Sequence, residues 1–81
     1  MNKIELAQNP NTSSEVLQTL ATDENSGVRR SVASNPKTPV ETLQSLATDE
    51  DSDVRWYVGR HSNATELIRR LVLMTDSKLA Q

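Results

Sequence analysis

The chain has 81 residues, of which 35% are hydrophobic, with no phenylalanine and no cysteine, so it has room for one domain with a small aliphatic core. The missing cysteine excludes disulfides, thiolate metal sites and iron–sulfur ligation. Eleven acidic and nine basic side chains give a net charge of −2, which predicts no general attraction to the phosphate backbones of nucleic acids.

A unit of 26 residues is repeated along the chain. Residues 6–31 align with residues 32–57 at fifteen identical positions, and a fixed period of this length is typical of helical solenoids. Residues 58–81 read as a degenerate third copy, which loses one residue near Ser62 and lacks the asparagine–proline pair of the other two. We therefore expect a single repeat domain over residues 1–81, with units at 6–31, 32–57 and 58–81.

Each unit is expected to contain a longer and a shorter helix. In chain order, the predicted helices lie near residues 13–22, 27–34, 39–48, 53–60 and 64–75. In the longer helix of the second unit, Val40, Leu43 and Leu46 recur at helical spacing and form one apolar face. Capping boxes at residues 12–15, 38–41 and 63–66 predict where the longer helices begin.

The shorter helices follow the candidate N-caps Ser26 and Ser52. Proline at position 36 disfavours helical geometry at the residue before it, so the helix near residues 27–34 should end at Asn35. Because only about seven residues are available, a 3₁₀ turn is the alternative to a short α-helix here. His61 takes the place in the third unit that Asn35 holds in the second.

The segment 32–50 and the pair Val54–Arg55 resemble the leucine-rich repeat variant family. The resemblance implies α-helices that alternate with 3₁₀ or short α-helices in a right-handed superhelix without β-strands. The expected fold is therefore all-α, a short right-handed α-solenoid of two and a half to three repeats. A more distant similarity to HEAT repeats lies in the six-residue spacing that separates an aspartate from an arginine in both good units.

That spacing joins Asp23 to Arg29 and Asp49 to Arg55. An arginine after a helix C-terminus can bind phosphate, or it can join turns of a solenoid by charge-assisted hydrogen bonds. We favour the second interpretation and predict a structural ladder of these four residues. The acidic loop residues Glu24, Glu50, Asp51 and Asp53 are interpreted as solvated residues before a helix, because their spacing does not match a calcium loop.

The two good units disagree at a few positions, and these are the candidates for contact with a partner. Trp56 is the only tryptophan, stands where the preceding unit has Arg30, and is followed four residues later by Arg60. Tryptophan and arginine are enriched in the energetic centres of interfaces, so we predict a partner-binding site at these three residues. The third unit also adds Leu67 and Met74 where the second has polar residues, which indicates a weak homodimer unless the tail from Lys78 covers them.

The sequence predicts a non-enzymatic protein-interaction or scaffolding module in the cytoplasm, without cofactor, metal or membrane contact. No catalytic constellation accompanies His61, and no glycine-rich phosphate loop is present. The alternative is a nucleic-acid-binding repeat protein. Its arginine-rich face would draw on six residues, Arg29, Arg30, Arg55, Arg60, Arg69 and Arg70.

Overall fold

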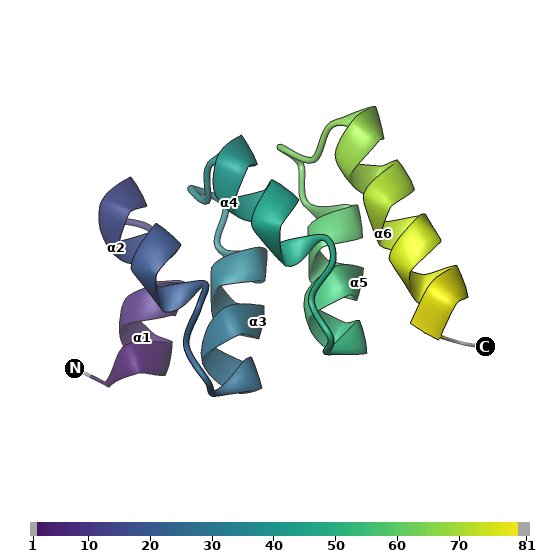
Figure 1. The fold of residues 1–81 in the computed structure, drawn as a ribbon. Coiled ribbons are helices and arrows are strands. Elements are labelled where there is room, and N and C mark those ends of the chain that lie inside the picture. The colour runs from purple at the N-terminus through teal and green to yellow at the C-terminus, as the bar shows by residue number, and fades with distance from the viewer. Residues whose placement is uncertain (1, 80–81) are drawn as a thin grey trace.

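The computed structural model describes residues 2–79, and within this range the chain forms six helices and no strand. The helices are α1 (Lys3–Gln8), α2 (Ser14–Leu20), α3 (Ser26–Ser34), α4 (Val40–Leu46), α5 (Ser52–Arg60) and α6 (Glu66–Leu79) (Figure 1). The expected all-α class is thereby confirmed for the described part of the chain.

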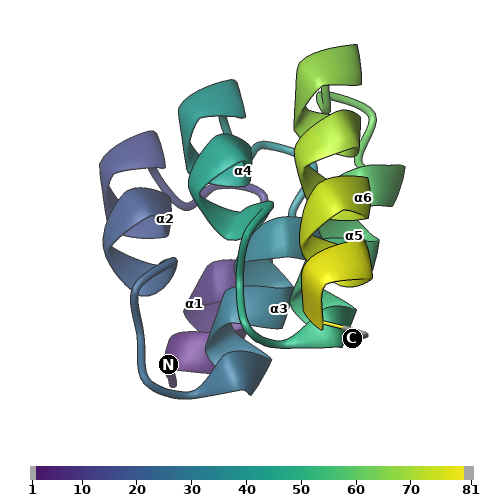
Figure 2. The same ribbon diagram turned by 45° about the vertical axis from the view of Figure 1, so that its right-hand side comes forward.

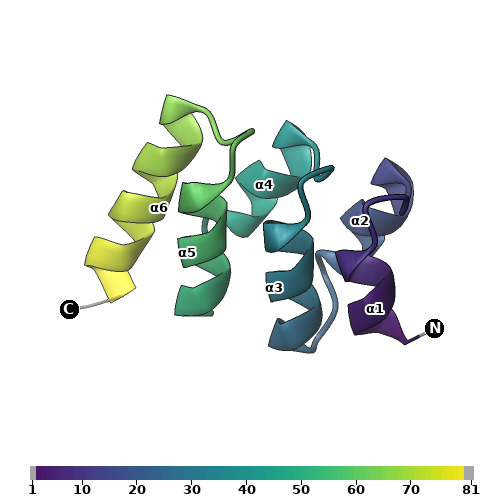
Figure 3. The same ribbon diagram turned by 180° about the vertical axis from the view of Figure 1, so that it is seen from behind.

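The helices form two layers that stack along the long axis of a body measuring 38 × 23 × 16 Å. Helices α1, α3 and α5 lie side by side in one layer, which faces the viewer in Figure 3. Helices α2, α4 and α6 form the other layer, nearer the viewer in Figure 2. This alternation is the packing that a helical repeat requires.

The core lies between the two layers and is almost entirely aliphatic. Its largest fully buried apolar side chains are those of Leu17, Val32, Leu43, Leu46, Val54, Val58 and Ile68. Positions 17 and 43 are equivalent in the 26-residue repeat, as are positions 32 and 58. Equivalent residues of successive units therefore build one continuous apolar seam, as the repeat pattern indicated.

Helix α1 was not among the five predicted helices. The internal match begins at Leu6, and Lys3, Ile4 and Glu5 share no identity with the residues 26 positions later, so the pattern gave no signal there. The Asn2 side chain accepts a hydrogen bond from the Glu5 backbone N–H (2.8 Å) and starts the helix. A helix that corresponds to α3 and α5 therefore also precedes α2.

The predicted contrast in helix length is wrong for the first two units. Helices α2 and α4 have seven residues each, whereas α3 and α5 have nine and are α-helical rather than 3₁₀. Helix α2 stops early because the N–H groups of Thr22 and Asp23 bond to carbonyls three residues back, at 3.2 and 3.1 Å, which tightens the last turn. Helix α6 runs to Leu79, beyond the predicted end at residue 75.

The predicted capping residues of the longer helices are also wrong. Ser13 caps α2 through the Val16 N–H (3.2 Å), and Thr65 accepts from the Ile68 N–H (3.2 Å) in the first turn of α6. Pro39 precedes α4 and makes no side-chain cap bond. The threonine of the second predicted box, Thr38, is fully buried and donates its hydroxyl to the Val32 carbonyl (2.6 Å), so it closes the turn between α3 and α4.

The N-caps of α3 and α5 lie one residue before the predicted ones, Ser26 and Ser52. Asn25 caps α3 through the Gly27 N–H (2.7 Å), and Asp51 caps α5 through the N–H groups of Asp53 and Val54 (2.8 and 3.1 Å). Ser26 is the first residue of α3. Asparagine and aspartate at these equivalent positions are as favourable as serine for capping.

Asn35 leaves helix α3 with extended backbone geometry (φ −70°, ψ 123°), as the following proline predicted. Its side-chain amide donates to the carbonyls of Ala7 (2.8 Å) and Asn9 (3.0 Å) in the preceding unit. His61 lies at the same point after α5, and its Nε2 lies 2.7 Å from the Asn35 carbonyl. Because the Asn63 N–H donates to His61 Nδ1 (2.9 Å), Nε2 carries the proton and donates. We call Asn9, Asn35 and His61 the asparagine ladder.

Candidate functional site

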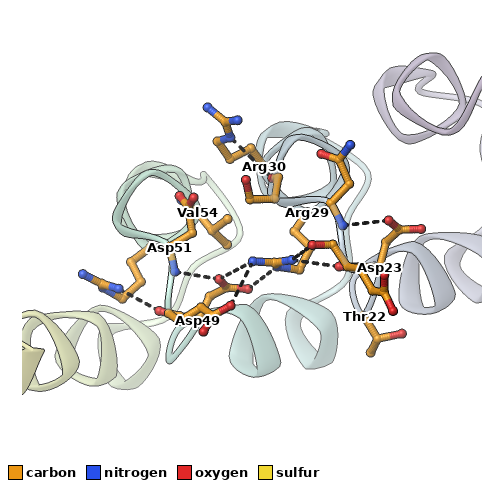
Figure 4. A network of polar contacts seen from close by, with 12 residues as sticks. Thr22, Asp23, Arg29, Arg30, Asp49, Asp51 and Val54 are labelled. Carbon is orange, nitrogen blue, oxygen red and sulfur yellow. Dashed lines mark hydrogen bonds and ion pairs between the residues drawn. The ribbon is translucent and has the colours of Figure 1, made fainter.

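Arg29 is the most completely bonded charged residue in the described part of the chain. Its Nε and a terminal nitrogen donate to the two carboxylate oxygens of Asp49, at 2.8 and 3.2 Å. Its other terminal nitrogen donates to the carbonyls of Asp23 (2.8 Å) and Glu24 (3.0 Å), as Figure 4 shows. Both charged side chains are about nine-tenths buried, and hydrogen bonding to Asp49 raises the pKa of Arg29.

The same contact recurs one unit earlier and one unit later. Lys3, 26 residues before Arg29, pairs with Asp23 at 2.8 Å, and this hydrogen bond is the main cause that lowers the pKa of Asp23. Arg55, 26 residues after Arg29, pairs with Asp76 of α6 and donates to the Asp49 carbonyl (2.7 Å). We call these three pairs the charged ladder.

The six-residue spacing seen in the sequence corresponds only to main-chain contacts. Arg29 donates to the backbone carbonyl of Asp23, and Arg55 donates to the backbone carbonyl of Asp49. The carboxylates of these two aspartates instead pair with basic residues of the preceding unit, Asp23 with Lys3 and Asp49 with Arg29. Each rung of the charged ladder therefore joins two units. Asp76, which lies on α6 beyond the predicted helix end, was missed by sequence reasoning.

The acidic loop residues do not converge on a common point. Burial raises the pKa of Asp51, but the N–H groups of Val54 and Asp53, together with the charge of Arg30, lower it by more, so the net shift is downward. Asp53 pairs with Arg30 at 3.4 Å. Over residues 2–79, no group of three histidine, aspartate or glutamate side chains is placed to hold a metal ion.

The three predicted partner-binding residues lie on one surface of α3 and α5. Trp56 is 54% exposed, its ring meets that of Tyr57 edge to face at 5.1 Å, and the Arg60 guanidinium lies 4.8 Å from the Trp56 ring centroid. Arg30, from the neighbouring helix, lines a cavity together with both aromatic residues. We call Arg30, Trp56, Tyr57 and Arg60 the Trp56 surface. Tyr57, the residue after Trp56 in α5, is 38% exposed and belongs to this surface.

Two hollows flank Trp56. One, of about 610 Å³, contains both members of two ion pairs and is lined by Arg30, Ser52, Asp53, Arg55, Trp56, Tyr57 and Asp76. The other, of about 460 Å³, contains no carboxylate and is lined by Ala33, Ser34, Pro36, Trp56, Tyr57, Arg60, His61 and Ser62. We call the second one the α3–α5 hollow.

The residues predicted for self-association are strongly exposed. Leu67 is 63% exposed and Met74 68%, and they lie seven positions apart on α6. Leu73 is equally exposed on another side of the same helix and was not singled out from the sequence. The alternative was that the tail from Lys78 covers Leu67 and Met74. The Leu79 side chain and residues 80–81 of this tail lie outside the described residues.

Comparison with known proteins identifies one unit of the repeat. Residues 27–51 match the model of the leucine rich repeat variant family, so the resemblance inferred from the sequence is confirmed over this span. The matched residues comprise nearly all of α3, the whole of α4 and the loop that leads to α5. No curated protein and no solved structure matches the chain. Among the described residues, no helix is long and apolar enough to cross a membrane.

Proposed function

We propose that the chain is a non-enzymatic protein-interaction module that contacts its partner through the Trp56 surface. The observation that carries this proposal is the exposure of Trp56 beside Tyr57 and Arg60 in a chain that has no other aromatic residue. Exposed aromatic and arginine side chains that lie together have the composition of interface hot spots. Leucine rich repeat variant units generally act in protein interaction, which agrees with this proposal.

The polar residues with catalytic chemistry are used by the fold. Both ring nitrogens of His61 are hydrogen-bonded, one to the Asn35 carbonyl and the other to the Asn63 N–H, and Arg29 and Arg55 are engaged in the charged ladder. A general base or an anion site needs a group with a free atom facing a substrate. These contacts support a module that binds rather than one that catalyses a reaction.

The nucleic-acid alternative draws little support from the arginines on which it depended. Of the six, Arg29, Arg30, Arg55 and Arg70 each pair with a carboxylate, and Arg60 lies over Trp56. Arg69, which is exposed on α6, makes neither kind of contact among the described residues. A groove for a phosphate backbone needs several cations that face solvent together. We therefore expect no DNA binding tighter than the non-specific range of about 10⁻⁴–10⁻⁶ M, and submicromolar affinity by fluorescence anisotropy would favour the alternative.

Selection of a random peptide library on the immobilised protein tests the proposal. We expect enriched peptides whose affinity falls by about thirtyfold or more in Trp56→Ala, the loss typical of a hot-spot tryptophan. Leu73→Ala is the matched control, because it removes an equally exposed apolar side chain from α6. Far-UV circular dichroism verifies that both variants are folded. If no peptide is enriched, or if Trp56→Ala binds the enriched peptides as tightly as the parent, the proposed function is wrong.

A further inference from the structure

Arg60 differs from the paired arginines in how its guanidinium is used. Its charged group lies over the face of the Trp56 ring, and among the described residues it makes no ion pair and no side-chain hydrogen bond. A guanidinium donates through its edge, in the plane of the group. Because no described residue accepts a hydrogen bond from Arg60, its N–H donors remain available to bind a planar anion through two parallel hydrogen bonds while the charge lies over the Trp56 ring.

The α3–α5 hollow beside Arg60 is suited to an anionic ligand with an apolar neighbour. Its walls carry no carboxylate, whereas Asp53 and Asp76 line the other hollow and are paired with arginines. Ala33, Pro36 and the Trp56 ring supply apolar surface. Its volume of about 460 Å³ falls in the range of small ligand-binding clefts.

The C-termini of α3 and α5 lie beside the hollow, and the partial negative charge of a helix C-terminus would repel an anion there. Some of the carbonyl groups at these helix ends are already engaged, however, and the Val58 carbonyl of α5 accepts from the His61 N–H at 3.1 Å. The Val32 carbonyl accepts from the Thr38 hydroxyl at 2.6 Å, and the Asn35 carbonyl accepts from His61 at 2.7 Å. The full charge of Arg60 is therefore the dominant electrostatic feature of this hollow.

We infer that the α3–α5 hollow binds an acidic peptide segment, with a carboxylate on the Arg60 guanidinium and an adjacent apolar side chain against Trp56. This inference rests on the proposed function and specifies the class of partner. The charge complementarity between the lining of the hollow and a carboxylate selects this occupant over a basic or neutral peptide.

Three blocked heptapeptides of one design test the inference. In the first, three glutamates alternate with leucines; in the second and third, glutamine or lysine replaces glutamate. Fluorescence of Trp56, the sole tryptophan, reports binding to the purified protein. We expect the glutamate peptide to bind about tenfold tighter than the glutamine peptide, as for a lost hydrogen bond to a charged group, and its advantage to decrease as salt rises.

The variant Arg60→Gln should remove the preference for glutamate, and Arg60→Lys should keep part of it, because lysine retains charge but lacks the planar fork. Arg70→Gln is the matched control, since it removes the same charge from an exposed site on α6 and should leave the preference unchanged. Equal binding of the glutamate and glutamine peptides, or an unchanged preference in Arg60→Gln, overturns the inference. Tighter binding of a single-stranded oligothymidylate than of the glutamate peptide also overturns it.

The peptides enriched by library selection separate this inference from the proposed function. If they require Trp56 but are not acidic and bind Arg60→Gln as tightly as the parent, the acidic-peptide inference fails while the proposed function stands. If they require both residues and contain carboxylates, both are supported.

Discussion

Replacement of Arg29 by alanine should be the most damaging single change in the charged ladder. The substitution removes four hydrogen bonds, two to Asp49 and one each to the carbonyls of Asp23 and Glu24. It leaves the Asp49 carboxylate, whose side chain is about nine-tenths buried, without its cation. Removing one partner of a buried ion pair typically destabilises a protein by about 3–5 kcal/mol, and a chain of this size has about 4–12 kcal/mol of total stability.

The same change at Arg55 should be milder, because its partner Asp76 is 48% exposed and water can solvate the carboxylate that remains. We expect a loss of about 1–3 kcal/mol for Arg55→Ala. Arg29→Lys should fall between the parent and Arg29→Ala. Lysine keeps a charge, as Lys3 does in its pair with Asp23, but it cannot bind a carboxylate in the bidentate manner.

Urea unfolding monitored by far-UV circular dichroism measures these differences as shifts in midpoint at constant slope. Arg70→Ala serves as the control, since the pair of Arg70 with Glu66 is exposed on α6 and its loss should change stability by less than about 0.5 kcal/mol. The reasoning is refuted if Arg29→Ala unfolds within about 0.5 kcal/mol of the parent, or if Arg55→Ala proves the more damaging change.

Four further predictions concern other parts of the molecule. The pKa of Asp51 is lowered in the folded state, so its carboxylate stabilises the fold fully above the ordinary aspartate pKa of about 3.9, and this stabilisation is lost as pH falls through the lowered pKa. Asp51→Asn should therefore make the melting temperature depend less on pH in the acid range. His61→Asn should melt like the parent, whereas His61→Ala should lose about 1–3 kcal/mol, because it leaves a backbone carbonyl and an N–H unpaired; equal melting of the two variants would contradict this. The buried Thr42 hydroxyl has no hydrogen-bond partner among the described residues, so Thr42→Val should stabilise the protein by about 1 kcal/mol in urea titrations. Sedimentation at high concentration should detect a weak dimer that Leu67→Ser combined with Met74→Ser removes, and a parent that stays monomeric would count against self-association through α6.

Much of the helix arrangement was readable from the sequence because apolar spacing depends on local geometry alone. Leu43, Leu46 and Val54 are buried as their periodicity indicated, whereas Val40, which was expected on the same face as Leu43, is 39% exposed in the first turn of α4. The helix ends were less readable, because a threonine before a helix has two uses. Thr38 could cap α4 or close the turn after α3, and only the path of the whole turn decides that its hydroxyl faces the Val32 carbonyl.

The charged ladder shows the same limit at longer range. Sequence spacing placed Asp49 six residues before Arg55, but the side-chain partner of Asp49 is Arg29, 20 residues before it. Which carboxylate lies opposite which guanidinium depends on how far and in which direction one unit is displaced from the next. That displacement arises from side-chain packing between units, which no pattern within one unit encodes.

The short sequence separation between bonded residues in the two ladders also affects how fast the chain folds and which parts of it unfold first. Among the described residues, the longest hydrogen bond in sequence terms joins Asn35 to the Ala7 carbonyl, 28 positions away. Loops this short close quickly and at small entropic cost, so folding should be fast for the size of the protein. Because each rung joins only adjacent units, an outer helix pair can detach while the central unit stays folded, and amide hydrogen exchange should be slowest in α3 and α4.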